Sequence, residues 1–173
     1  MPSKLHPIAP CFVFNNQAEQ AVKFYVSTFK RSKILGMTRY TEGQPGAPGT
    51  VATVTFELMG QKMFAANGGP QFTFSMGLSL YVSCDTQQEI DRLWETLSRG
   101  GEKQYCGWVQ DRYGVSWQIV PRILEKMIAD KDPQRGHRVN QAIYGMRKLD
   151  IAALQAAYAV KTVKKKAAAR RGR

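Results

Sequence analysis

Alternation of hydrophobic and polar residues is clearest in the stretch 106–121, CGWVQDRYGVSWQIVP, which predicts two short strands joined by a turn. Asp111 opens that turn, where its side chain can accept hydrogen bonds from the backbone, and a glycine closes it, where positive φ carries no penalty. Side chains alternate across a strand, so Ser116, Gln118 and Val120 share one face, opposite Trp117. We expect Trp117 to pack on a helix, which leaves a partly polar face around Gln118 suited to lining a cavity.

The hydrophobic pattern predicts the order strand, helix and three strands twice along the chain. The strands expected from apolar runs and turn residues are 8–14, 33–40, 50–58, 61–66, 77–84, 102–105, 107–112 and 115–120. Two helices are expected at 16–29 and 86–97, each opened by a capping-box pair, Asn16 with Glu19 and Thr86 with Glu89. The helices also align residue by residue, with Ala21, Phe24 and Tyr25 opposite Ile90, Leu93 and Trp94, which favours an internal duplication.

Residues after Pro121 turn helical, with helices expected at 122–129, 137–147 and 151–159, the last capped by Asp150. The fold class is therefore α+β, with two tandem βαβββ modules followed by C-terminal helices. The domains expected are a two-module domain 1–121 (modules at about 8–67 and 77–121), a helical extension 122–159 and a basic tail 160–173. An apolar face on the last helix is expected to cover a sheet or a partner subunit.

Charge is concentrated at the end of the chain, because seven lysines and arginines in 161–173 supply more than half of the net charge of +12. This tail, KTVKKKAAARRGR, has the composition of a disordered, solubilising segment. The alternative is an arm that makes weak, non-specific contacts with nucleic acid or another polyanion. No motif of a nucleic-acid-binding fold precedes the tail.

Three cysteines at no recognisable disulfide or metal spacing, together with no signal peptide, predict a cytoplasmic protein. No apolar run is long enough to cross a membrane. Cys11 and Cys84, both on expected strands, are interpreted as small buried hydrophobes.

Four blocks of this sequence resemble the PhnB-like branch of the vicinal-oxygen-chelate superfamily, which also contains glyoxalases, bleomycin-resistance proteins and extradiol dioxygenases. They are IAPCFVFNNQAEQAVKFYVSTF (8–29), NGGPQFTFSMGLSLYVSCDTQQEIDRLWETLSRGG (67–101), CGWVQDRYGVSWQIVP (106–121) and MRKLDIAALQAAYA (146–159). The resemblance implies two sheets curled into cups and a homodimer. The branch is often labelled as a 3-demethylubiquinone-9 3-methyltransferase domain.

Metal-using relatives in this superfamily hold a divalent ion through His, Glu or Gln on the first and last strands of the repeats. The corresponding positions here are Ala9 or Pro10, Phe64, Ser79 and Gln118, and only Gln118 is an oxygen ligand of the usual type. Protein sites for such ions need more ligands than this, so no metal or other cofactor is expected. Methyl transfer is also not expected, because 43–49 and 68–69, the Gly-rich stretches, precede strands rather than helices.

Candidate ligand-contacting residues are those expected on the concave faces of the sheets: Gln118, Ser116, Ser79, Tyr81, Phe64 and Trp108, with Phe72 and Phe74 as aromatic positions that suit a pocket or a core. No catalytic group is identified: Asp111 and Glu57 are interpreted as structural, and His6 and His137 lie outside the cup strands. The predicted function is metal-independent binding of a small molecule. The alternative is a divalent-metal isomerase, lyase or dioxygenase with ligands such as Gln118, Glu57 or His6, and whether the protein is an enzyme stays open.

Overall fold

The computed structural model describes residues 8–160 and divides the chain into two compact units. Unit 1 comprises the residues up to Leu80 with Glu95–Glu102 and Gln110–Trp117, and unit 2 comprises Tyr81–Trp94, Lys103–Val109 and the residues from Gln118 onward. Residues 161–173 of the expected basic tail lie outside the described residues, as does His6. No helix in the described part of the chain has the length and apolar character that crossing a bilayer requires.

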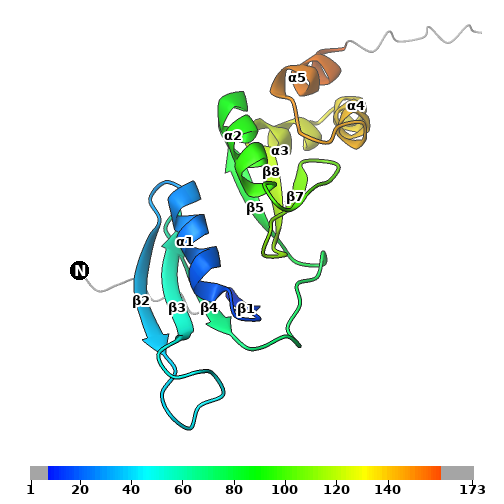
Figure 1. Cartoon of the computed structure of the whole chain (residues 1–173). Coiled ribbons are helices and arrows are strands. Elements are labelled where there is room, and N and C mark those ends of the chain that lie inside the picture. The colour runs from blue at the N-terminus through cyan, green and yellow to red at the C-terminus, as the bar shows by residue number, and fades with distance from the viewer. Residues whose placement is uncertain (1–7, 161–173) are drawn as a thin grey trace, which may run out of the picture. The chain divides into compact units, whose positions relative to one another are not determined.

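The expected βαβββ order occurs twice and is confirmed (Figure 1). The first copy consists of β1 (Cys11–Phe14), α1 (Ala18–Thr28), β2 (Lys33–Arg39), β3 (Val51–Leu58) and β4 (Gln61–Asn67). The second consists of β5 (Ser79–Cys84), α2 (Gln87–Leu97), β6 (Glu102–Lys103), β7 (Trp108–Gln110) and β8 (Ser116–Pro121). Each copy builds a four-stranded sheet, in the orders β1-β4-β3-β2 and β5-β8-β7-β6. The structure therefore confirms the predicted α+β class with two tandem modules.

Turn chemistry sets the register of the first sheet. β3 and β4 pair antiparallel through Met59 and Gly60, both at positive φ (51° and 88°), as a two-residue hairpin turn requires. β1 pairs parallel with β4, placing Cys11 opposite Phe64. On β3, Val54, Phe56 and Leu58 are buried on alternate positions, and α1 packs against this sheet.

Helix α1 begins differently from the prediction. Its N-cap, Gln17, makes no side-chain capping bond, and the expected pair of Asn16 and Glu19 does not form the cap. Instead the Ala18 N–H donates to Asn67 Oδ1 (2.9 Å), a residue 49 positions later at the end of β4. The capping prediction for α2 holds, since Thr86 Oγ1 accepts from the Glu89 N–H at 3.2 Å.

Three helices complete unit 2: α3 (Ile123–Ile128), α4 (Pro133–Tyr144) and α5 (Ile151–Ala159). The expected start of α4 at residue 137 is wrong, because Asp132 caps it by accepting from the Gln134 N–H and Pro133 takes its first position, which favours proline. Leu149 and Leu154 are fully buried with Val139, Ile143 and Met127 in one cluster. The same cluster includes Val120 of β8, so the apolar face of the last helix is covered within its own unit.

Candidate functional site

A cavity of about 280 Å³ lies within unit 1, where β1, the segment between β4 and β5, and the first residues of β5 and β8 meet. Its wall consists of Cys11, Phe12, Val13, Phe72, Thr73, Phe74, Ser75, Leu78, Ser79, Leu80, Val115 and Ser116. The wall contains aromatic, aliphatic and small hydroxyl side chains and no ionisable residue other than a cysteine. Such a surface is suited to an organic molecule rather than to an ion.

Aromatic packing fixes the segment that closes one side of this cavity. The Phe74 ring lies edge-on to Phe14 (5.1 Å between centroids) and to Phe12 (6.1 Å). Phe72 passes close to Gly68, where a Cβ atom would lie 2.6 Å from the Phe72 ring and 2.5 Å from Val13. The Phe74 ring therefore holds the connecting segment against β1, which forms one wall of the cavity.

Ser116 is the unusual polar residue of the wall. Its side chain is 2% exposed, and its Oγ is buried without a hydrogen-bond partner among the described residues. A buried hydroxyl that forms no hydrogen bond costs about 1–3 kcal/mol, so native proteins rarely retain one without a use. Ser116 is therefore the position on the wall where a bound molecule would gain most from a polar atom.

Asp111 anchors the β7–β8 turn beside this wall and is 2% exposed. Its Oδ1 accepts from the backbone N–H groups of Tyr113 (2.8 Å) and Val115 (3.1 Å). Its Oδ2 accepts from the Tyr25 hydroxyl and from Trp117 Nε1, both at 2.8 Å. Burial raises the pKa of Asp111, and these donated hydrogen bonds oppose that rise. All four bonds are structural, which agrees with the interpretation of Asp111 as a turn residue.

The packing of Trp117 on a helix is confirmed within the same unit. Its ring lies 5.2 Å from that of Tyr25 on α1 and stacks on Phe29 at 5.2 Å. The opposite parity of Ser116 and Trp117 on β8 therefore directs one residue to the cavity wall and the other to the core.

The six candidate ligand residues do not all lie at the same site. Ser79 and Ser116 line the same cavity, together with Phe72 and Phe74. Phe64 is half-buried on β4 outside that lining, with Lys62 Nζ 5.4 Å from its ring centre. Tyr81, Trp108 and Gln118 belong to unit 2. Tyr81 is 49% exposed, and partial burial, with the nearby Glu125 carboxylate, raises its pKa.

Cys11 was expected to be buried, but it is exposed and lines the cavity. The strand CFVF explains this, because Phe12 and Phe14 face the core and Cys11 must therefore face the other way. Cys84 is buried as expected, and burial raises its pKa to about 12.

A larger hollow of about 760 Å³ lies under the loop between β2 and β3. Its polar groups already hold the backbone in place: Arg39 Nη1 donates to the Gly49 carbonyl (2.8 Å), and the Tyr40 hydroxyl donates to the Asn67 carbonyl (2.5 Å). Asn67 in turn caps α1 and donates to the Val51 carbonyl. The side chains of Arg39, Tyr40 and Asn67 are therefore engaged in holding the backbone around this hollow.

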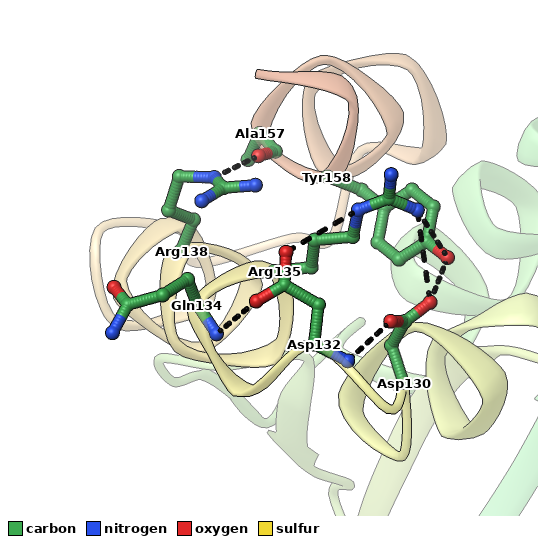
Figure 2. Close-up of polar contacts among 7 residues, drawn as sticks. All are labelled: Asp130, Asp132, Gln134, Arg135, Arg138, Ala157 and Tyr158. Carbon is green, nitrogen blue, oxygen red and sulfur yellow. Dashed lines mark hydrogen bonds and ion pairs between the residues drawn. The ribbon is translucent and has the colours of Figure 1, made fainter. Parts of the chain in front are cut away.

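A polar cluster joins the start of α4 to the end of α5 (Figure 2). The Tyr158 hydroxyl donates to the Asp130 carboxylate, and this bond is the largest of the effects that lower the pKa of Asp130. The Asp132 N–H and the Arg135 guanidinium lower that pKa further. Arg138 Nε donates to the Ala157 carbonyl (3.1 Å), where a helix C-terminus leaves carbonyls unpaired. This cluster ties α5 to α4.

Metal ligation has little support in the described part of the chain. No three His, Cys, Asp or Glu residues between 8 and 160 are grouped so that they could hold one ion. Glu57 Oε2 lies 3.4 Å from Lys33 Nζ, which engages it in an ion pair, and His137 is exposed on α4.

The matching family model and a similar solved structure carry the same description. The family model of 3-demethylubiquinone-9 3-methyltransferase matches residues 6–120. A structure described as a putative 3-demethylubiquinone-9 3-methyltransferase, PhnB protein, from Bacillus cereus is 37% identical, covers 66% of this chain and 98% of its own, and has a TM-score of 0.62.

More distant structures share the fold alone. Protein PA1353 from Pseudomonas aeruginosa is 20% identical, with 66% and 96% coverage and a TM-score of 0.57. The fosfomycin resistance protein FosX from Listeria monocytogenes is 12% identical, with 73% and 97% coverage and a TM-score of 0.50. A comparison with curated proteins finds no match.

Proposed function

The chain belongs to the 3-demethylubiquinone-9 3-methyltransferase family, the PhnB-like branch of the glyoxalase superfamily, and from this premise we propose that it binds a small organic molecule in the cavity of unit 1 without a metal ion. One observation carries the proposal: a defined, mostly apolar cavity contains a buried hydroxyl, that of Ser116, with no partner among the described residues. Concave apolar sites with few polar groups are the usual form of small-molecule sites.

Methyl transfer, which the family description mentions, is not part of the proposal. A cofactor site of the Rossmann type needs a Gly-rich turn between a strand and a helix N-terminus. The glycines of 43–49 lie between β2 and β3, and Gly68 and Gly69 lie between β4 and β5, so both stretches connect strands.

Within the described part of the chain, the divalent-metal alternative has no specific feature in its favour. It would draw on residues such as Glu57, which is paired with Lys33, and His6, which lies outside the described residues. The predicted homodimer now rests on the family resemblance alone, because the apolar face of α5 is covered within its own unit. Homodimerisation, a cytoplasmic location and contacts of the tail with polyanions stay predictions.

Alkylation of Cys11 tests the proposed binding. We expect iodoacetamide at neutral pH to modify Cys11, which is exposed at the cavity. Cys84 should not react, because burial shields it and raises its pKa, so that it stays a thiol. Adding 2-methylnaphthalene, a neutral apolar probe, is expected to slow the modification of Cys11 several-fold. Peptide mass mapping over time measures each cysteine separately.

Cys106, which belongs to unit 2, serves as the internal control, and its modification rate should not respond to the probe. Replacing Cys11 with tryptophan should abolish binding of 2-methylnaphthalene, seen in ligand-observed NMR, because the indole would fill the cavity mouth. Cys11→Ser, the matched variant, should keep it. A rate at Cys11 that is the same with and without the probe would contradict the proposal.

A further inference from the structure

Resting on the proposed function, we infer that the ligand is a neutral aromatic molecule of one or two rings whose hydroxyl or carbonyl group hydrogen-bonds the Ser116 hydroxyl. Ser116 is then the residue that sets specificity in the cavity. Three features of the molecule point to such a ligand: the polarity of the wall, the size of the cavity and the way in which the neighbours of Ser116 are held.

The polarity of the wall selects a neutral ligand. Apart from the Cys11 thiol, the lining contains no ionisable side chain, and phenylalanine, valine and leucine side chains make up more than half of it. A charged group brought into such a site would lose its hydration without gaining a partner, which is strongly unfavourable. Flat aromatic rings would pack well against Phe72 and Phe74, since offset and edge-on ring contacts are favourable.

The size of the cavity limits the ligand to a small molecule. Drug-sized ligands occupy pockets of about 300–1,000 Å³, and an apolar cavity of about 150 Å³ in another protein accepts benzene. At about 280 Å³, the cavity lies between these cases. One or two fused rings with a small substituent would therefore fill it.

The residues on both sides of Ser116 are held by the same carboxylate, Val115 through its backbone and Trp117 through its indole. The Val115 N–H donates to Asp111 Oδ1 at 3.1 Å, and Trp117 Nε1 donates to Asp111 Oδ2 at 2.8 Å. Ser116 is thus held between two anchored neighbours. Because the site is ordered before binding, little entropy is lost when the hydrogen bond forms.

The other two serines of the wall are already engaged. Ser75 Oγ accepts from the Gly77 N–H at 3.0 Å, and Ser79, on the strand next to β8, already has an interaction partner. Ser116 is the wall serine whose Oγ is buried without a partner among the described residues. It is therefore the polar group that a ligand would satisfy.

The test compares two probes of nearly equal shape, 2-naphthol and 2-methylnaphthalene, which differ by a hydroxyl in place of a methyl group. Affinities are measured by ligand-observed NMR for the native chain and for Ser116→Ala. We expect the variant to bind 2-naphthol about 3- to 10-fold more weakly, the usual worth of one hydrogen bond, and 2-methylnaphthalene unchanged. The anion 2-naphthoate should bind the native chain at least about 10-fold more weakly than 2-naphthol.

Ser75→Ala is the matched control, because it removes a wall hydroxyl that is already bonded, and it should not discriminate between the two neutral probes. If both neutral probes bind but Ser116→Ala weakens neither, the role of Ser116 is overturned while binding in the cavity stands. If neither probe binds the native chain, the proposed function itself fails. Tighter binding of 2-naphthoate than of 2-naphthol would overturn the neutral-ligand class.

Discussion

Replacing Asp111 with alanine is expected to lower the free energy of unfolding by about 3–5 kcal/mol, as measured by urea denaturation. The carboxylate accepts four hydrogen bonds, from Tyr25, Trp117 and two backbone N–H groups, and all are lost together. Burial raises the pKa of Asp111, so desolvating the charge is itself costly. The destabilisation therefore comes mainly from buried donors that are left without an acceptor.

Two further variants separate this explanation from a loss of volume. Tyr25→Phe removes one donor and leaves Asp111 with three, so it should cost only about 1–2 kcal/mol. Asp111→Asn should fall between the two, because its amide keeps one acceptor oxygen but turns an NH₂ group toward two donors. If Asp111→Ala were no more destabilising than Tyr25→Phe, Asp111 would not be the anchor of the turn.

Replacing Gly101 with alanine is expected to destabilise unit 1 by about 3 kcal/mol, again measured by urea denaturation. A Cβ atom at this position would lie 2.1 Å from the Gln110 carbonyl oxygen and 2.9 Å from Asp111 Cα. Both are backbone atoms, which cannot move aside as a flexible side chain can. The methyl group would push the backbone away just where the carboxylate of Asp111 is held.

Gly36 provides the matched control, because a Cβ atom there would have no neighbour within 4 Å. Gly36→Ala should change stability by less than about 1 kcal/mol and is expected to be neutral or slightly stabilising. Equal effects of the two alanine substitutions would contradict the argument from close backbone approach.

Local sequence signals predicted most of the elements. The hairpin at Met59–Gly60, the Thr86 cap and the Asp150 cap depend on residues close together in the chain, and the structure confirms each. The cap of α1 could not be predicted in this way, because Asn67 supplies it across 49 residues. Helix α4 starts earlier than the residue 137 expected from the sequence, because Asp132 acts as its cap and Pro133 as its first helical residue.

The candidate site shows the same division between local and long-range information. Strand parity placed Ser116 opposite Trp117, which put Ser116 on the wall and Trp117 in the core. Applied to β1, the same parity would have revealed Cys11, which was instead classed by residue type. Asp111 finds its partners on α1 and β8, and Ser116 finds none within residues 8–160. Both facts depend on tertiary packing, for which the sequence contains no pattern.

Metal-independent binding in the cavity of unit 1 is tested most directly by repeating the Cys11 protection after exhaustive dialysis against EDTA. We expect 2-methylnaphthalene to slow the alkylation of Cys11 to the same extent before and after dialysis, with metal analysis confirming that divalent ions are removed. Protection that disappears with the metal and returns when a divalent ion is added would contradict it, and would favour a metal-dependent enzyme with atypical ligands.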